Sequence, residues 1–226
     1  MKRLLAVVCA VFTLLSFNKA HAVEQDAIQI LLEAEATTRH VLGSKHYPEL
    51  NEAFNKAVGV VIVPRLLKGG FIIGGEYGNA VLLAKKQDGT WSYPAFYTMG
   101  GGSVGFQIGL KDSQMILVIR THVGLEAILQ DQFKAGAEAG VVIGSFGGSV
   151  EGAATTAMGA DIIAFSLDRG LFGGGALEGS VFAKRKDLNE AFYSEIVEPR
   201  QIVIEGAVSN PAADSLRSTL SALETQ

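Results

Sequence analysis

A glycine-flanked serine is the first pattern in this sequence that could carry chemistry. Residues 101–105 (Gly-Gly-Ser-Val-Gly) match the G-x-S-x-G motif of serine hydrolases, in which the serine stands at a sharp turn between a strand and a helix. The apolar residues at 106, 108 and 110 alternate with a period of two, which predicts a strand after the serine. Asp112 and His122 are the residues that could complete the order serine, acid, histidine. A serine hydrolase using Ser103 is kept as an alternative hypothesis.

Metal and thiol chemistry have no matching pattern. Residues 100–105 match the G-x-G-x-x-G pattern of dinucleotide sites, but that site needs a helix after the glycines and none is predicted there. His40 and His46 do not have the i, i+4 spacing of a zinc protease, and His122 is isolated in the sequence. There is no Cys-x-x-Cys pair, no calcium-binding loop and no Gly-Lys-Ser/Thr phosphate loop. The single cysteine, Cys9, lies in the N-terminal apolar run. We expect no catalytic residue, no metal, no cofactor and no enzymatic activity.

Basic residues offer a different function, the binding of an anionic headgroup. The candidate headgroup contacts are Arg65, Lys68, Lys85, Lys86, Lys184, Arg185 and Lys186. Such residues also stand at solvated strand ends, where they discourage edge pairing. If folding gathers several of them, each could add on the order of 1 kcal/mol of attraction to a charged surface. The apolar and aromatic residues expected to be exposed nearby are Leu66, Leu67, Trp91, Tyr93, Phe96 and Tyr97.

Residues 1–22 have the pattern of a cleavable signal peptide. Lys2 and Arg3 precede an apolar run over residues 4–17, and residues 20–22 (Ala-His-Ala) have the small-x-small form of a cleavage site. The apolar run is too short to span a bilayer comfortably as a helix. We expect export to a bacterial periplasm and a mature chain that begins at Val23.

The mature chain, residues 23–226, is acidic. Loss of Lys2, Arg3 and Lys19 leaves 16 of the 19 basic residues against 23 acidic ones, a net charge near −7. Non-specific nucleic-acid binding depends on neutralising phosphates, so we expect no nucleic-acid partner. Its length suffices for one core without disulfides. No linker divides it, so we expect a single domain over 23–226.

Apolar periodicity predicts helices at both ends of the chain and one in the middle. We expect a helical hairpin over residues 24–42 and about 48–58, and the middle helix over residues 124–134. Asn210 is placed to cap a final helix that has Pro211 at its first position. In the first helix, one face is apolar and the opposite face is acidic. The expected apolar residues are Ile28, Leu31, Leu32, Thr38 and Leu42.

Between Gly59 and Gly179 lie 25 of the 27 glycines, interleaved with short β-branched and aromatic runs. Glycine inside strand patterns marks bulges, bends and close backbone approaches, and Asp88-Gly89 is a hairpin signal. The expected strands are 60–63, 71–73, 80–84, 91–98, 104–108, 115–120, 140–143, 150–155, 162–166, 177–183 and 202–204. The predicted fold class is α+β: an N-terminal helical hairpin packed on a Gly-rich, strongly curved antiparallel β-sheet or partly closed barrel, with a C-terminal helix.

Several motifs, in order, resemble the SYLF domain family. The opening motifs are 56–64 (Lys-Ala-Val-Gly-Val-Val-Ile-Val-Pro), 68–71, 89–96 and 103–109, and the closing ones are 169–172, 177–180, 185–187 and Tyr193. The resemblance covers about residues 52–193. Val63 and Phe165 depart from it, where the family pattern has an aromatic residue and a tyrosine. The resemblance implies a non-catalytic lipid-binding domain, since eukaryotic members bind phosphoinositide membranes and actin, and bacterial members are exported and regarded as lipid-binding.

The leading hypothesis is therefore a periplasmic protein that binds anionic phospholipid headgroups in envelope maintenance. Its expected partner is an anionic lipid or membrane surface, and actin is not expected in this compartment. A structural or scaffolding module that binds a protein partner is the first alternative, and the serine hydrolase is the second.

Overall fold

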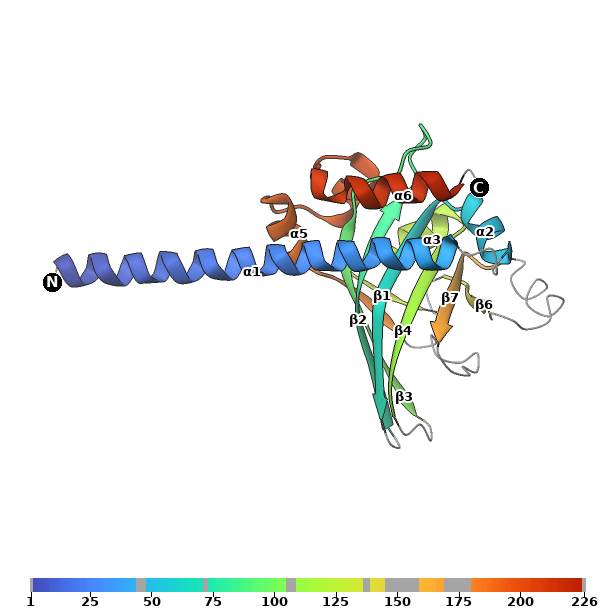
Figure 1. The fold of residues 1–226 in the computed structure, drawn as a ribbon, viewed down its shortest axis with the longest axis horizontal. Helices are drawn as coiled ribbons and strands as arrows, with labels where there is room; N and C mark the ends of the chain where they lie inside the picture. Colours follow the sequence, from blue (N-terminus) through green and yellow to red (C-terminus); the bar gives the residue numbers. More distant parts are fainter. Residues whose placement is uncertain are drawn as a thin grey trace.

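The computed structural model describes residues 2–43, 48–70, 73–104, 109–135, 139–144, 159–168 and 180–224. In this part of the chain, eight strands form one curved sheet in the order β5-β8-β3-β2-β1-β4-β7-β6, with helices α1, α5 and α6 on one side of it (Figure 1). The strands are β1 (Gly59–Gly70), β2 (Ile73–Ala84), β3 (Ala95–Val104), β4 (Gly109–Ile119), β5 (Gln132–Lys134), β6 (Val141–Gly144), β7 (Ile162–Asp168) and β8 (Val181–Lys184). The helices are α1 (Lys2–Leu42), α2 (Pro48–Asn55), α3 (His122–Ile128), α5 (Lys186–Tyr193) and α6 (Asp214–Glu224), with short turns η1 (Gln201–Glu205) and η2 (Pro211–Ala213).

The central strands bury both of their faces, because side chains alternate across a strand. In β1, Val60 and Ile62 face the helices, whereas Val61 and Val63 face the opposite side. Continuous apolar runs in β1, β2 and β4 reflect this two-sided burial. The sheet therefore separates two cores, which we call the outer core, under the helices, and the inner core, on the concave side.

The outer core is closed by one face of α1 together with α2, α5 and α6. Ala27, Leu31 and Ala34 of α1 are buried against the sheet. Phe54 of α2 stacks on Trp91, with ring centroids 5.6 Å apart and an interplanar angle of 3°, a geometry that aromatic pairs favour. Small residues on α1 let the helix approach the sheet closely, which holds α1 across the strands.

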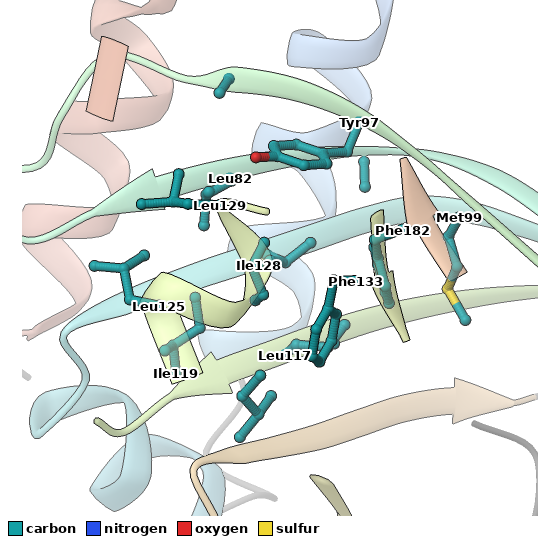
Figure 2. Close-up of a cluster of buried hydrophobic side chains, with 14 of the residues drawn as sticks. Leu82, Tyr97, Met99, Leu117, Ile119, Leu125, Ile128, Leu129, Phe133 and Phe182 are labelled. Carbon is teal, nitrogen blue, oxygen red and sulfur yellow. The ribbon is translucent and has the colours of Figure 1, made fainter. Parts of the chain in front are cut away.

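The inner core is filled by α3 and by aromatic side chains from the short strands β5 and β8 at one end of the sheet (Figure 2). Leu125 and Ile128 of α3 are buried in it. Phe133 of β5 lies opposite Phe182 of β8 in the register, and their ring centroids are 5.9 Å apart. The hydroxyl of Tyr97 is buried here without a hydrogen-bond partner among the described residues, and burial raises its pKa.

The predicted α+β class is confirmed, and so are several local signals. Asp88 Oδ1 accepts hydrogen bonds from the backbone and side chain of Thr90, and Gly89 has a φ of 82°, a left-handed conformation that suits glycine. Asn210 caps η2 by accepting from the Ala212 N–H. The predicted helices at the two ends of the chain are present as α1, α2 and α6.

Other elements differ from the sequence-based expectation. The middle helix ends at Ile128, because 132–134 form strand β5 and place Phe133 against Phe182. The predicted strand 202–204 is instead the π-helical turn η1, which buries Ile202 and Val203 in the inner core. Helix α5 was not predicted, β6 pairs with β7 in parallel, and Leu32 is 58% exposed.

Some predicted strands can be compared with the structure only in part. The parts that lie outside the described residues are all of 150–155, residues 71 and 72 of the strand 71–73, residues 105–108 of 104–108, and residues 177–179 of 177–183.

Asn189 ties α5 to β3 at the point where pairing with β8 stops. Its side chain is fully buried, and its Oδ1 accepts from the Phe96 N–H at 2.9 Å while its Nδ2 donates to the Phe96 carbonyl at 3.3 Å. β8 pairs only with residues 97–100 of β3, so the amide continues the ladder by one residue. Buried backbone groups of this kind require partners.

We predict that Asn189→Ala lowers the free energy of unfolding by about 1–3 kcal/mol, because it leaves the Phe96 N–H buried and unpaired. Urea denaturation monitored by circular dichroism measures this. Glu190→Ala, at the next and exposed position, is the control and should change stability by less than about 0.5 kcal/mol. Equal effects of the two substitutions would show that the Asn189–Phe96 bonds do not matter.

Candidate functional site

A groove of about 450 Å³ lies between α1 and the outer face of β1 and β2, and we call it the α1–β2 groove. This volume falls within the range of small-ligand pockets in proteins. Its lining residues come from α1, the two strands and α5. They are Asp26, Gln29, Ile30, Glu33, Pro64, Arg65, Leu67, Tyr77, Gly78, Asn79, Arg185 and Leu188.

A bulge in β1 determines which side chains face this groove. The pairing of β1 with β2 shifts between Ile62 and Arg65, so one extra residue is inserted around Pro64. Proline has no N–H to give to a ladder and is tolerated at bulges. An extra residue reverses the alternation of side chains. Leu66 therefore points into the inner core, and its neighbours Arg65 and Leu67 face outward.

Two large apolar side chains stand exposed on this outward face. Leu67 and Tyr77 are opposite each other in the β1–β2 register and are 44% and 53% exposed. Directly opposed side chains in an antiparallel pair lie close enough to form one surface. Beneath them, Ile30 and Leu188 are buried. The groove thus has an apolar floor and an exposed Leu–Tyr pair at its edge.

The two walls of the groove carry different charged groups. On the strand side, Arg65 Nε donates to Asp112 at 2.8 Å. Arg185 donates to both oxygens of Asp187, at 2.8 and 2.7 Å, and its Nη1 donates to Asn79 Oδ1 at 3.0 Å. The guanidinium lowers the pKa of the Asp187 carboxyl, which stays ionised at neutral pH. On the α1 side the charged groups are the carboxylates of Asp26 and Glu33.

The seven predicted headgroup contacts lie in separate places. Arg65 and Arg185 line the α1–β2 groove. Lys68 lies on the opposite, inner face, where its Nζ is 3.2 Å from Glu76 and both side chains are 9% exposed.

The other four lie outside the groove. Lys184 and Lys186 share Glu198, at 3.1 and 3.3 Å, and they lower the pKa of its carboxyl. Lys85 pairs with Glu224 at 3.1 Å, and Lys86 belongs to the Asp88–Gly89 turn.

Ser103 and His122 do not come together. Ser103 lies at one end of the sheet, where it pairs with Gly74 of β2. At the same end, Gly74 pairs with Gly70 of β1, and Gly70 pairs with Gly109 at the start of β4. His122 follows the opposite end of β4. The ten steps along β4 at about 3.3 Å each separate these ends by roughly 33 Å. A Ser103–His122 pair is excluded by this geometry, and Ser103 lies within a strand instead of at a strand-to-helix turn.

The histidines and carboxylates offer no metal centre within the described ranges, where no three suitable side chains gather. His40 Nδ1 lies 2.9 Å from Gln114 Oε1 and ties α1 to β4, and His46 lies outside the described residues. Among the helices of the described part of the chain, none has a stretch long and apolar enough to cross a bilayer.

Sequence reasoning found part of this site and missed part. Of the six apolar residues expected to be exposed, Leu67 is exposed and Tyr93 is half-buried, with Arg217 4.0 Å above its ring. The four that are buried are Leu66, Trp91, Phe96 and Tyr97. Tyr77 and Asn79 were not identified. The Pro64 bulge is the signal that could have placed Leu67 and Tyr77 on one outward face.

We predict that Gly78→Ala disturbs the bulge, because a Cβ there would lie 2.6 Å from the Arg65 carbonyl oxygen. The expected loss in the free energy of unfolding is about 1–3 kcal/mol, measured by urea denaturation. Gly102→Ala is the matched control, since a Cβ at Gly102 meets nothing within 4 Å. A Gly78→Ala protein as stable as the control would contradict the close backbone approach at the bulge.

Comparison with known proteins gives one family. The family model described as "Ysc84: Las17-binding protein actin regulator" matches residues 100–223. The chain is 30% identical over 168 residues to LAS seventeen-binding protein 3 of Saccharomyces cerevisiae, covering 73% of this chain and 36% of that protein. It is 30% identical over 158 residues to the human SH3 domain-containing YSC84-like protein 1, covering 70% of this chain and 46% of that protein. The chain thus spans less than half the length of these relatives.

The names of these relatives correct one expectation. They describe proteins that bind another protein, Las17, or that contain an SH3 domain, and neither name describes a lipid ligand. The expectation of an anionic lipid or membrane surface as the partner is therefore wrong. The spacing of basic residues suggested a headgroup site, but most of these residues pair with carboxylates distant in sequence, such as Lys184 with Asp131 and Arg65 with Asp112.

Proposed function

This chain belongs to the Ysc84 (SYLF) family, and on that premise we propose that it is a non-catalytic module that binds a protein partner through the α1–β2 groove. The observation that carries the proposal is the exposed pair Leu67 and Tyr77 at the edge of that groove. Large apolar side chains gathered on a surface mark interaction sites, and tyrosine is enriched at protein interfaces.

The groove supplies a shape in addition to apolar surface. Strands β1 and β2 continue past α1 (Figure 1), so the helix forms one wall and the outward face of the strands forms the other. Both strands are already paired on two sides, which leaves no free edge for strand addition by a partner. Recognition therefore rests on side chains, with Leu67 and Tyr77 as its apolar centre.

The non-catalytic part of the proposal is supported by the position of Ser103. It stands in β3, far from His122, so the G-x-S-x-G pattern does not form a nucleophile elbow. In addition, the yeast relative is named for binding another protein and the human relative for an SH3 domain, and neither name describes a reaction.

We predict that a photo-reactive side chain in the groove captures a protein. Tyr77→p-benzoylphenylalanine, expressed in the native organism and irradiated, should give an adduct heavier by the mass of a protein. Ile196→p-benzoylphenylalanine is the control, because Ile196 is 83% exposed and outside the groove. Adding Leu67→Ser should reduce the adduct about fivefold, the scale of one apolar interface contact.

Mass spectrometry of the adduct identifies the partner. Absence of a protein adduct at position 77, or equal adducts at 77 and 196, would contradict the proposal.

Export is the second part of the proposal. Among the α1 side chains whose burial is described, which begin at His21, Val23 is the first that packs on the outer core, whereas His21 and Ala22 are exposed. Cleavage after Ala22 would therefore preserve the packing of the described α1 side chains from Val23 onward. In Figure 1 the N-terminal half of α1 projects away from the rest of the protein, as expected for a segment that the fold does not need.

We predict that protein purified from the periplasm of its own bacterium begins at Val23. Edman sequencing of the osmotic-shock fraction measures this directly, and a Lys19→Ala chain with the same cleavage site should give the same N-terminus. Recovery of a chain that begins with Met1, or recovery in the cytoplasmic fraction alone, would overturn the export proposal.

A further inference from the structure

The α1 wall of the groove carries two carboxylates on one helical face. Asp26 and Glu33 are seven residues apart, which is two turns of helix and places them on the same side. Glu33 accepts a hydrogen bond at 2.8 Å from Gln29, which lies between them. Within the described ranges, neither carboxylate has a basic side chain within ion-pair distance. These two negative charges are thus available to a ligand.

The arginines of the opposite wall offset these charges only in part, since Arg185 is hydrogen-bonded to Asp187 and attracts Asp26 from a distance. Arg65 is paired with Asp112, and Arg185 with Asp187. Counting the groove and these partners gives two guanidinium groups and four carboxylates, an excess of two negative charges. Such a field attracts a cation and repels an anion. Arg185 is held in place by hydrogen bonds to Asp187 and Asn79, and Arg65 donates to Asp112.

The Leu67–Tyr77 pair adds an apolar requirement next to this negative field. Leu67 offers aliphatic surface. The exposed Tyr77 ring can pack on an aliphatic side chain or take a cationic head over its face. A ligand that satisfies both features carries a positive group beside an apolar one.

We propose that the α1–β2 groove binds a basic segment of a protein partner, with a Lys or Arg placed between Asp26 and Glu33 and an adjacent apolar side chain against Leu67 and Tyr77. This inference rests on the proposed function and names the chemistry of the partner. The excess of negative charge selects the basic residue, and the exposed pair selects its apolar neighbour.

Three fluorescein-labelled dodecapeptides test the chemistry by fluorescence anisotropy with the full chain. One alternates Lys with Leu, one replaces Lys by Glu, and one replaces Leu by Ser. The Lys–Leu peptide should bind most tightly, the Lys–Ser peptide about fivefold or more weakly, and the Glu–Leu peptide not measurably. Binding of the Lys–Leu peptide should weaken as salt rises, since its charges are exposed. Equal binding by the Lys–Leu and Glu–Leu peptides would overturn the proposal.

A matched pair of double variants separates the groove from overall charge. Asp26→Asn with Glu33→Gln should raise the Kd of the Lys–Leu peptide about five- to tenfold, the scale of two partly screened charge pairs. Glu190→Gln with Glu195→Gln removes the same charge at exposed positions outside the groove, and it should change the Kd less than twofold. Equal weakening by the two double variants would mean that the peptide senses net charge, and the proposal would fall.

The same variants distinguish failure of this inference from failure of the proposed function. In the photo-capture experiment at position 77, the Asp26→Asn, Glu33→Gln chain should lose most of its protein adduct. An adduct that survives this change but is lost with Leu67→Ser would leave the protein-binding function standing and refute the basic segment. Loss of both the adduct and the peptide binding in the unmodified chain would refute both.

Discussion

Strand β1 cannot keep one pairing register along its whole length, because Pro64 has no N–H to give to either neighbouring strand. The register shifts between Ile62 and Arg65 against β2, and between Val63 and Leu66 against β4. Before the shift, β1 buries side chains on both faces. After it, the outer face carries Arg65 and Leu67, beyond the cover of α1. The outward placement of Arg65 and Leu67, and with it the strand wall of the groove, depends on this inserted residue.

The same bulge explains why the two faces of the extended strands differ. Inward, Lys68 is paired with Glu76, and Ser180 donates to Glu76. A buried ion pair is tolerated only when hydrogen bonds and opposite charges satisfy both of its members. Lys68, Glu76 and Ser180 therefore have a structural role. On the outward face, Leu67 and Tyr77 are exposed to solvent. The surface that is free to act in binding is therefore the outer one.

Local signals in the sequence predicted local structure well. The Asn210 cap, the Asp88–Gly89 turn and the α+β class follow from residues close together in the chain. The partners of the basic residues could not be predicted, because Arg65 meets Asp112 only once β1 pairs with β4, and Lys184 meets Glu198 only once the segment after α5 folds back. Tyr77 follows the regular alternation of β2 and was missed because the predicted strand began only at residue 80, whereas β2 begins at Ile73. Apolar periodicity also could not distinguish the π-turn η1 from a strand over three residues.

The central claim is that a protein partner occupies the groove created by the β1 bulge. Hydrogen–deuterium exchange, measured on the chain alone and with the captured partner, tests this most directly. The account predicts that added protection is concentrated in residues 64–67 and 77–79 and on α1 over 26–33. Protection at α3 and η1 with none at these segments would place the interface elsewhere and contradict the account.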